Sequence, residues 1–433
     1  MSMMASLVAL FQTSTKLALV GGMLLDGYEV PPVHHAVVLV EGDRIVKVGR
    51  ARDIPIPSGY EVIDTSGRTM LPGLIDLHAH LTILGHGDYG RYFTWLEEES
   101  DLSLEDIMEI SAKQLLEAGI TTAVDLGAPL EESVRVRDRI ARGEIPGPRI
   151  LVSGAWVARR TFGGFPPDSQ RLVTSPEEAS QAVEELVKGG ADVIKAWAGL
   201  TREDYDAIVA TAHRLGVPVH AHLYDPESLR NALEAGVDVL QHVGSAGTPP
   251  YEPELIRAIV ESGRPVVPTG AHRVWVFPAT VQFPERLQDR RLKADFPAAL
   301  YDEVQRSFED FHTLAYFRTT PRQMFFGEAS MKQWIDAGAV IGMGTDSGTP
   351  MNFHTEALWR ELKVFVDLGM SPQAAISAAT RVNARILGKS NELGTIEAGK
   401  LADIIVVKGN PLFNIMALAD VVTVVKGGRV FQH

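Results

Sequence analysis

The chain has 433 residues, of which 45% are hydrophobic and 22% are charged, as is typical of a globular protein with a sizeable core. Its formal net charge of −14 argues against a general affinity for nucleic acid or for anionic membranes. The absence of cysteine excludes disulfides, cysteine nucleophiles and thiolate metal ligands. No apolar run approaches the roughly 18 residues that cross a bilayer, and we expect a cytoplasmic protein.

Both ends of the chain carry the pattern of β-structure. Residues 1–16 are expected to form a flexible leader and not a signal peptide, because no basic residue precedes their short apolar run. Short apolar runs separated by Gly- and Asp-containing turns then fill residues 17–70, and they return in residues 391–433. We therefore predict one small β-sandwich domain formed by both chain termini.

The middle of the chain, residues 71–390, alternates strand-like and helical segments. Eight apolar runs predict strands at residues 71–81, 121–127, 149–154, 191–197, 218–224, 238–244, 265–270 and 339–348. Helices are predicted over residues 103–119, 175–190, 202–216 and 225–236, which have apolar residues at three- and four-residue spacing and close on Gly. This alternation predicts the α/β class, as a (β/α)8 TIM barrel. Two long connections, residues 82–102 and 271–331, are expected to form pocket walls or lids at the C-terminal ends of the strands.

Several possible metal ligands fall at the ends of these strands. In DLHAH, His78 and His80 project to the same side of a strand, so both imidazoles can reach one ion. Lys195 ends an apolar inner strand, where burial is costly unless the amine is paired or converted by CO₂ into a carbamate that bridges two ions. Other strand ends carry His220, His222, His242 and Asp346.

Each of these residues alone has a simpler interpretation. A lysine at a strand end can reach solvent, a histidine can be a satisfied core residue, and an aspartate can cap the next loop. The metal site is favoured because the residues fall together at the C-terminal ends of strands one, four, five, six and eight. Nitrogen and oxygen donors without sulfur suit Zn²⁺, Mn²⁺ or Co²⁺.

Longer motifs give the chain a resemblance to a known family. They are VIDTSG at residues 62–67, LPGLIDLHAH at 71–80, AGITT at 118–122, GTD at 344–346, GMSPQAAI at 369–376, LGTIEAGKLAD at 393–403 and NPL at 410–412. With these motifs the chain resembles the amidohydrolase superfamily, in its imidazolonepropionase- and prolidase-like branch. The resemblance implies one metal ion on His78, His80 and Asp346, and a homo-oligomeric state. It implies a second ion on His222 and His242, with carbamylated Lys195 bridging both. His222 is chosen over His220 because relatives keep the second histidine of this pair as the ligand.

The expected chemistry follows from this site. Two ions that share one hydroxide generate a nucleophile at neutral pH, and Asp346 would take its proton and deliver it to the leaving amine. We expect Asp76 to orient a ligand histidine. Trp197 and Tyr224 should point toward the barrel mouth, where Tyr224 could offer its phenol to the substrate. Further candidate substrate contacts are Arg159 and Arg160, which could bind a carboxylate, and His86, His272 and His354.

One departure from the prolidase-like pattern concerns the loop after the third strand. Relatives often carry Gly-Gly-His there, whereas this chain has Gly163-Gly164-Phe165. An aromatic residue in place of a polar one weakens the case for a simple dipeptidase. Together with Trp197 and the aromatic segment Tyr89–Trp95, it predicts a pocket that accommodates bulky apolar groups.

The resulting hypothesis is a binuclear metal hydrolase that cleaves an amide bond in a small molecule. Candidate substrates are Xaa-Pro dipeptides, N-acyl amino acids and aryl amides. The alternatives are a carbamate or urea hydrolase, a lactonase or organophosphate hydrolase, a mononuclear deaminase, and a scaffold without metals. A deaminase typically has Glu three residues after the histidine of the fifth strand, and this chain has Asp225 there.

Overall fold

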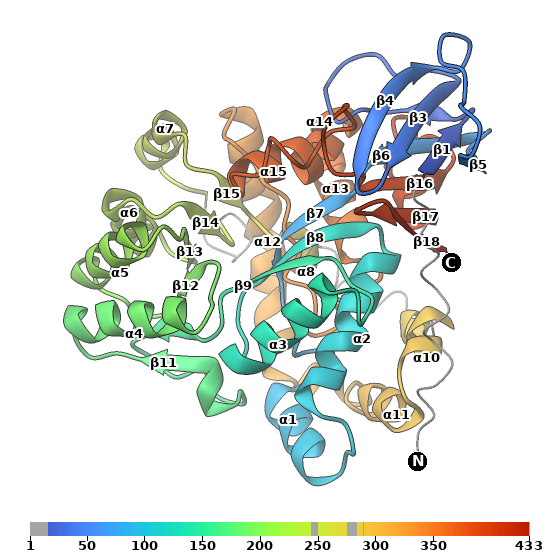
Figure 1. Cartoon of the computed structure of the whole chain (residues 1–433). Helices are drawn as coiled ribbons and strands as arrows, with labels where there is room; N and C mark the ends of the chain where they lie inside the picture. The colour runs from blue at the N-terminus through green and yellow to red at the C-terminus, as the bar shows by residue number, and fades with distance from the viewer. Residues whose placement is uncertain (1–15, 244–249, 275–283, 289, 433) are drawn as a thin grey trace. The chain divides into compact units, whose positions relative to one another are not determined.

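The computed structural model describes residues 16–243, 250–274, 284–288 and 290–432 (Figure 1). Residues 1–15 of the expected leader and residues 275–283 of the second long connection therefore lie outside the described residues. The chain divides into two compact units. One contains the described residues up to Ile75, Leu115–Thr122 and those from Met370 onward; the other contains Asp76–Gln114 and Ala123–Gly369.

The first unit contains two sheets that use strands from both ends of the chain. The four-stranded sheet has the order β4-β3-β1-β5, with β1 (Lys16–Val20), β3 (Ala36–Glu41), β4 (Arg44–Arg50) and β5 (Glu61–Asp64). The five-stranded sheet has the order β18-β17-β16-β6-β2, with β2 (Met23–Leu24), β6 (Arg68–Pro72), β16 (Ile404–Lys408), β17 (Val421–Lys426) and β18 (Arg429–Gln432). The antiparallel pairing of β16 with β6 joins the C-terminal strands to the N-terminal ones.

The two sheets share one hydrophobic core. Alternate residues of β1 and β3, among them Leu17 and Val38, pack in the same buried cluster as Ile404 and Val425. Alternation of this kind buries one face of each sheet. The same unit also contains the 3-10 helix η6 (Ile415–Ala419), α14 (Pro372–Ser377), the π-helical turn η5 (Ala378–Val382) and α15 (Asn383–Ile386).

The strands that lead to the candidate ligand histidines lie in two further sheets. A three-stranded sheet has the order β7-β8-β9, with β7 (Leu74–Ala79), β8 (Ile120–Asp125) and β9 (Arg149–Val152). A six-stranded sheet, parallel at every pairing, has the order β11-β10-β12-β13-β14-β15. Its strands are β10 (Trp156–Ala158), β11 (Gln170–Leu172), β12 (Ile194–Ala196), β13 (Val219–His222), β14 (Val239–Gln241) and β15 (Val266–Val267).

The expected eighth strand needs a correction. Residues 339–348 form no regular strand, but make isolated parallel bridges from Ile341 to Val266 in β15 and from Ser347 to Ala79 in β7. Asp346, between these two bridges, adopts a φ of 57°, which interrupts the extended backbone there. The three-stranded and six-stranded sheets are also linked through β9, because the amide of Asp192, just before β12, donates to the carbonyl of Val152 in β9 at 2.8 Å.

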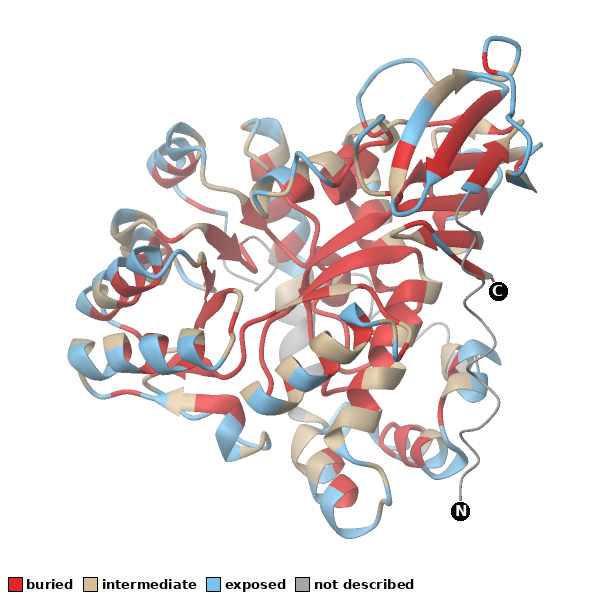
Figure 2. Ribbon diagram, viewed as in Figure 1, coloured by how far each residue is buried: buried red, intermediate tan, exposed pale blue. Residues whose placement is uncertain are grey.

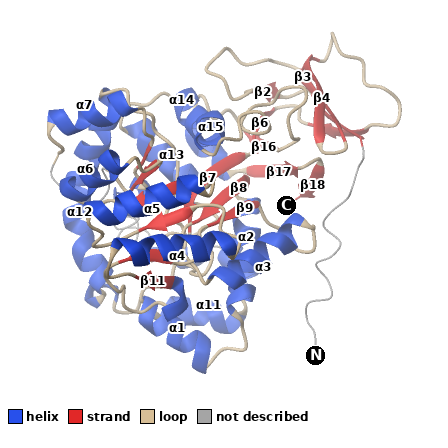
Figure 3. Cartoon of the chain, turned by 60° about the vertical axis from the view of Figure 1, so that its left-hand side comes forward, coloured by secondary structure: helices blue, strands red, loops and turns tan. Residues whose placement is uncertain are grey.

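All four helices predicted from the sequence are confirmed. They are α2 (Leu104–Glu117), α4 (Pro176–Lys188), α5 (Arg202–Arg214) and α6 (Pro226–Ala235). Ser175, Thr201 and Asp225 cap the last three of them at the N-terminus. Helices α4, α5 and α6 lie side by side (Figure 3), and Figure 1 shows them outside strands β12–β14. Each helix buries one face and exposes the other, whereas strands β12–β14 are almost wholly buried (Figure 2). The second unit also contains α3 (Leu130–Ala141), α7 (Pro253–Ser262) and the largely buried α13 (Ala357–Asp367).

The two long connections pack against each other. The first contains α1 (Tyr89–Glu98). The described part of the second contains α8 (Gly270–Val274), η3 (Pro284–Gln288), α10 (Arg290–Asp295), α11 (Ala298–Arg306), η4 (Phe311–Thr313) and α12 (Ala315–Asp336). Tyr92 and Trp95 of α1 share a buried cluster with Leu292 and Leu300. A short 3-10 helix, η2 (Pro167–Ser169), follows β10. Within the described ranges, none of the helices is both long and apolar enough to traverse a bilayer.

Candidate active site

The candidate metal ligands are carried by the C-terminal ends of the strands. His78 lies in β7 and His80 directly follows it; Lys195 lies in β12, His222 ends β13 and His242 follows β14. Asp346 follows the bridge at Ile341 and lies beside β7, because its amide donates to the carbonyl of His78 at 2.8 Å. All of these side chains are buried except that of His222, which is partly exposed. Parallel strands bring their C-terminal ends to one rim, so residues distant in sequence meet there.

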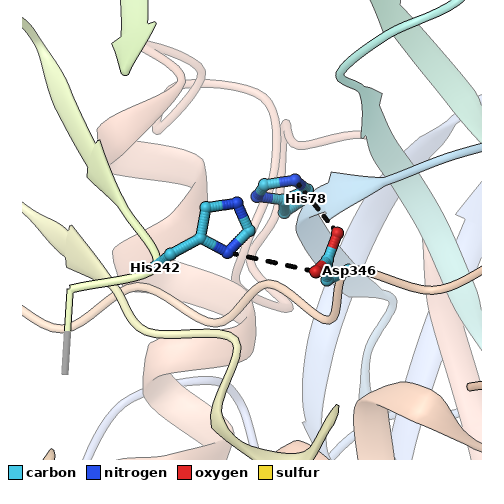
Figure 4. A group of neighbouring side chains, drawn as sticks. All are labelled: His78, His242 and Asp346. Atoms are coloured by element: carbon cyan, nitrogen blue, oxygen red, sulfur yellow. Dashed lines mark ion pairs between the residues drawn. The ribbon is translucent and has the colours of Figure 1, made fainter. Parts of the chain in front are cut away.

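The donor atoms of these side chains converge. His78, His242 and Asp346 point toward one another, and each offers an atom within 4.8 Å of the others (Figure 4). The Nε2 atoms of His78 and His80 lie 3.5 and 3.1 Å from Oδ1 of Asp346. Lys195 Nζ is 3.5 Å from Nε2 of His78. The ring of His222 is centred 4.4 Å from that of His242, so it belongs to the same group.

The protonation states of these residues fit a divalent metal ion. Burial lowers the pKa of both His78 and His242 well below the usual value, so both imidazoles are neutral and keep a lone pair. Burial alone would raise the pKa of Asp346, but hydrogen bonds from His272 and His80 outweigh it and hold that pKa well below its usual range. Neutral imidazoles and an ionised carboxylate are the forms that bind metals.

Gln241 fixes the orientation of one of these imidazoles. Its Oε1 lies 2.8 Å from Nδ1 of His78, and its Nε2 lies 3.0 Å from Nδ1 of His220 and 3.3 Å from the carbonyl of Leu77. The amide oxygen accepts from Nδ1–H of His78, which leaves Nε2 of that ring available to the site. His220 therefore contacts Gln241, which in turn contacts the candidate ligand His78. No local pattern indicates this role for Gln241, because an uncharged amide on a strand is common.

Asp76 does not orient an imidazole, contrary to expectation. Its Oδ1 accepts from the backbone amides of His78 at 2.9 Å and Thr345 at 3.1 Å, and its Oδ2 accepts from Oγ1 of Thr345 at 2.6 Å. Burial raises the pKa of Asp76 to about 7. The carboxyl group therefore ties β7 to the segment that carries Asp346, and acts on the backbone of the site.

Three residues at the site adopt left-handed backbone conformations. His242, Thr269 and Asp346 have φ values of 63°, 52° and 57°. Nδ1 of His242 lies 2.9 Å from Oγ1 of Thr269, so two of these residues contact each other directly. Such conformations cost about 1–3 kcal/mol each in non-glycine residues and gather at functional sites.

His272 lies closer to the site than the sequence indicated. It was a candidate substrate contact, but its buried ring in α8 places Nδ1 3.0 Å from Oδ2 of Asp346. Glu361 of α13 accepts from the amides of Gly270 and Ala271 at 2.8 and 2.7 Å, and so holds the first turn of α8. His272 and Asp346 follow different strands that are distant in the sequence, so no local sequence signal identifies the contact between them.

A cavity of about 230 Å³ opens beside these residues. Trp197 and Tyr224 line it, as do the aromatic residues Tyr89, Trp156, Phe162 and Phe165. The ring of Tyr224 is centred 4.2 Å from that of His222. The sequence reasoning missed Trp156, and also Gln323 and Thr349, which line the same cavity from the second long connection and from the loop after Asp346.

The remaining candidate substrate contacts are not among the described residues that line this cavity. Arg159 pairs through two nitrogens with Asp204 and donates to the carbonyl of Thr174 at 2.7 Å. Arg160 is exposed. His86 is buried against Glu303, with Nε2 and Oε1 3.2 Å apart. Nε2 of the buried His354 lies 3.0 Å from the carbonyl of His80, so this ring supports the ligand strand.

Comparison with known proteins shows the family of the chain. A family model for the amidohydrolase family matches residues 69–431. The chain belongs to the amidohydrolase family. It is a metal-dependent hydrolase that acts on carbon–nitrogen bonds, and its structural neighbours include prolidase-like members.

Three similar proteins carry different names. A putative prolidase from Bifidobacterium longum has a TM-score of 0.75 and 29% identity, covering 98% of this chain and 96% of that one. A 5-methylthioadenosine/S-adenosylhomocysteine deaminase of Symbiobacterium thermophilum is 26% identical over 96% of this chain and 93% of its own. An ochratoxinase of Aspergillus niger is 26% identical over 95% of this chain and 85% of its own.

Proposed function

We propose that this protein hydrolyses an amide bond in a small substrate that carries a bulky apolar group. In this proposal His78, His80 and Asp346 would hold one divalent ion, which is Zn²⁺, Mn²⁺ or Co²⁺. His222 and His242 would hold a second ion, and Lys195, as a carbamate, would contact both. The observation that carries the proposal is the convergence of imidazole, carboxylate and amine groups on one point beside a largely aromatic cavity.

The fold supports the same proposal. Backbone hydrogen bonds link β9 to the segment before β12, and residues 339–348 to both β15 and β7. These links favour a closed (β/α)8 barrel, with all ligands at one rim. The core that the two other sheets share favours a β-sandwich for the terminal segments.

Lys195 has the properties that carbamate formation requires. It is buried, and burial lowers its pKa to about 7, so much of the amine is neutral at neutral pH. A neutral amine nitrogen can attack the carbon of CO₂, with loss of one proton, to give an anionic carbamate. The divalent ions that the neighbouring imidazoles would hold would offset the negative charge of a carbamate, whereas a lone ammonium group buried among imidazoles is costly.

The other groups of the site can move protons and hold the substrate. Bound divalent ions supply Lewis-acid activation of water and of the scissile carbonyl. Asp346, held ionised by its neighbours, can accept a proton at Oδ1 or Oδ2 and pass it to the leaving amine. Tyr224 lines the cavity beside His222, where a phenol can donate to the developing oxyanion.

Amide hydrolysis fits the site better than deamination at one position. Asp225 stands where a deaminase typically carries its proton-shuttling Glu. Its Oδ1 accepts from the amide of Ser228 at 2.9 Å and its Oδ2 from the hydroxyl of the same residue at 2.6 Å. The carboxylate is therefore used as the N-cap of α6.

A hydrolysis screen tests the proposal. Protein loaded with zinc or manganese in the presence of bicarbonate is given Xaa-Pro dipeptides, N-acyl amino acids, aryl amides, carbamates, lactones and adenosine derivatives. We expect release of a free amine from an amide, loss of activity on chelation and in Lys195→Ala, and a metal content near two per chain. Lys188→Ala, at an exposed position of α4, is the matched control and should behave like the unaltered protein.

Deamination is the second candidate, because a relative 26% identical over 96% of this chain is named as a deaminase. Release of ammonia from an adenosine derivative, with one metal ion per chain and full activity in Lys195→Ala, would replace amide hydrolysis by this reaction. Lactone opening without amide cleavage would also overturn the amide proposal.

A further inference from the structure

One wall of the cavity is a continuous series of aromatic rings. The ring of Tyr89 is centred 4.8 Å from that of Phe165, which is 5.0 Å from Trp156. Trp156 is 4.7 Å from Trp197, and Phe162 is 5.0 Å from Trp197. The series ends at the candidate metal ligands, since the ring of Trp197 is centred 5.3 Å from that of His222. We call Tyr89, Trp156, Phe162, Phe165 and Trp197 the aromatic wall.

The aromatic wall is held in place by hydrogen bonds and by close packing. The indole Nε1 of Trp156 donates to the carbonyl of Leu126 at 2.7 Å. Gly127 makes room for that indole, because a Cβ at this position would lie 1.9 Å from Nε1. The buried side chain of Gln170 clamps Phe162 by accepting from its amide at 2.8 Å and donating to its carbonyl at 3.1 Å. Pre-organised rings lose little conformational entropy when a ligand binds.

The aromatic wall carries no formal charge. Among the described residues that line the cavity, the acidic and basic side chains other than histidine are Lys195 and Asp346, both in the candidate metal site. Arg159, on the loop that carries Phe162, directs its guanidinium to Asp204 and is not among those lining residues. An uncharged aromatic surface of this kind makes face and edge contacts with neutral planar rings.

We propose that the aromatic wall is a subsite for a neutral, planar aromatic ring of the substrate. The ring would lie along Phe162 and Trp197 and place the adjoining amide group at the metal site next to His222. This inference deepens the proposed function and rests on it, because it names the substrate class as amides that carry an aryl group. A saturated ring of the same size would fill the space without the favourable ring–ring contacts.

Matched substrate pairs test this inference. Benzoyl and 2-naphthoyl amides are compared with their cyclohexanecarbonyl and decahydronaphthoyl counterparts, all with the same leaving amine. Phe162→Leu is the main variant, because Phe162 is 37% exposed and its loss leaves the core intact. We expect the ratio of kcat/KM for aryl over saturated substrates to fall about 2- to 10-fold, the range that aromatic pair contacts span. Phe413→Leu, at a residue that is 92% exposed in the other unit, is the control and should leave the ratio unchanged.

A binding measurement separates failure of the subsite from failure of the proposed reaction. Titration with 2-naphthamide is followed by tryptophan fluorescence, which Trp156 and Trp197 should report. Saturable binding that weakens in Phe162→Leu, without any amide hydrolysis, would keep the subsite and reject the reaction. Hydrolysis with no preference for aryl over saturated substrates, or tighter binding of a tetraalkylammonium ion than of 2-naphthamide, would overturn the subsite.

Discussion

Replacing Gln241 by leucine tests whether this amide sets the tautomer and the orientation of the imidazole of His78, a candidate metal ligand. The substitution keeps the size of the side chain but removes the acceptor for Nδ1–H of His78 and the donor to Nδ1 of His220. A buried polar group left without a partner costs about 1–3 kcal/mol, so these two should cost about 2–6 kcal/mol together. Loss of a hydrogen-bond partner behind a ligand should also weaken metal binding about 10- to 100-fold.

Two measurements check these magnitudes. Urea unfolding of the metal-free protein gives the loss of stability, and competition with a chelator gives the metal affinity. Gln114→Leu is the control, because Gln114 is also fully buried but neither its Oε1 nor its Nε2 has a hydrogen-bond partner in the described part of the chain. We expect that variant to be as stable as the unaltered protein or more so. Normal metal binding by Gln241→Leu, together with a stability no lower than that of Gln114→Leu, would refute this role of Gln241.

Four further results are expected. Asp225→Ala should lower stability by about 1 kcal/mol through loss of the cap, yet keep kcat/KM for the amide; a large loss of activity would favour a shuttle role. Gly127→Ala should lower the unfolding temperature and weaken naphthamide binding, because its Cβ would overlap the indole of Trp156. Arg159→Met should lower the free energy of unfolding near neutral pH without altering KM, as measured by urea unfolding and kinetics. Burial raises the pKa of Asp204, but interactions with Arg159 and Thr201 outweigh this effect and hold the pKa below its usual value. The stabilisation that Arg159 provides is therefore present above the unfolded pKa of about 4, and it should disappear as acid protonates Asp204. Removal of divalent metal by a chelator should abolish hydrolysis and lower the unfolding temperature, and both should return when zinc is added.

The local pattern of the sequence was sufficient to predict the helices α2, α4, α5 and α6 and most of the strands. The periodicity of α4, α5 and α6 and the helix starts at Ser175 and Asp225 are properties of neighbouring residues, so the sequence predicts them directly, whereas the cap at Thr201 was not predicted. The strand predicted at residues 339–348 is wrong because the backbone at Asp346 is left-handed and its amide donates to the carbonyl of His78 in β7, a tertiary contact that a local pattern does not show.

The candidate ligands were recognisable because each follows an apolar run, and parallel strands must end at one rim. The sequence could not decide which other groups meet them. Gln241 contacts His78, and His272 contacts Asp346, across strands that are far apart in the chain. The sequence also offered Arg159 as a carboxylate-binding residue, whereas tertiary contacts direct it to Asp204. Residue type and local spacing thus determined which chemistry is available, and only the packing of distant segments decided which side chains face the cavity, because hydrogen-bond partners and charges are assigned by proximity in space.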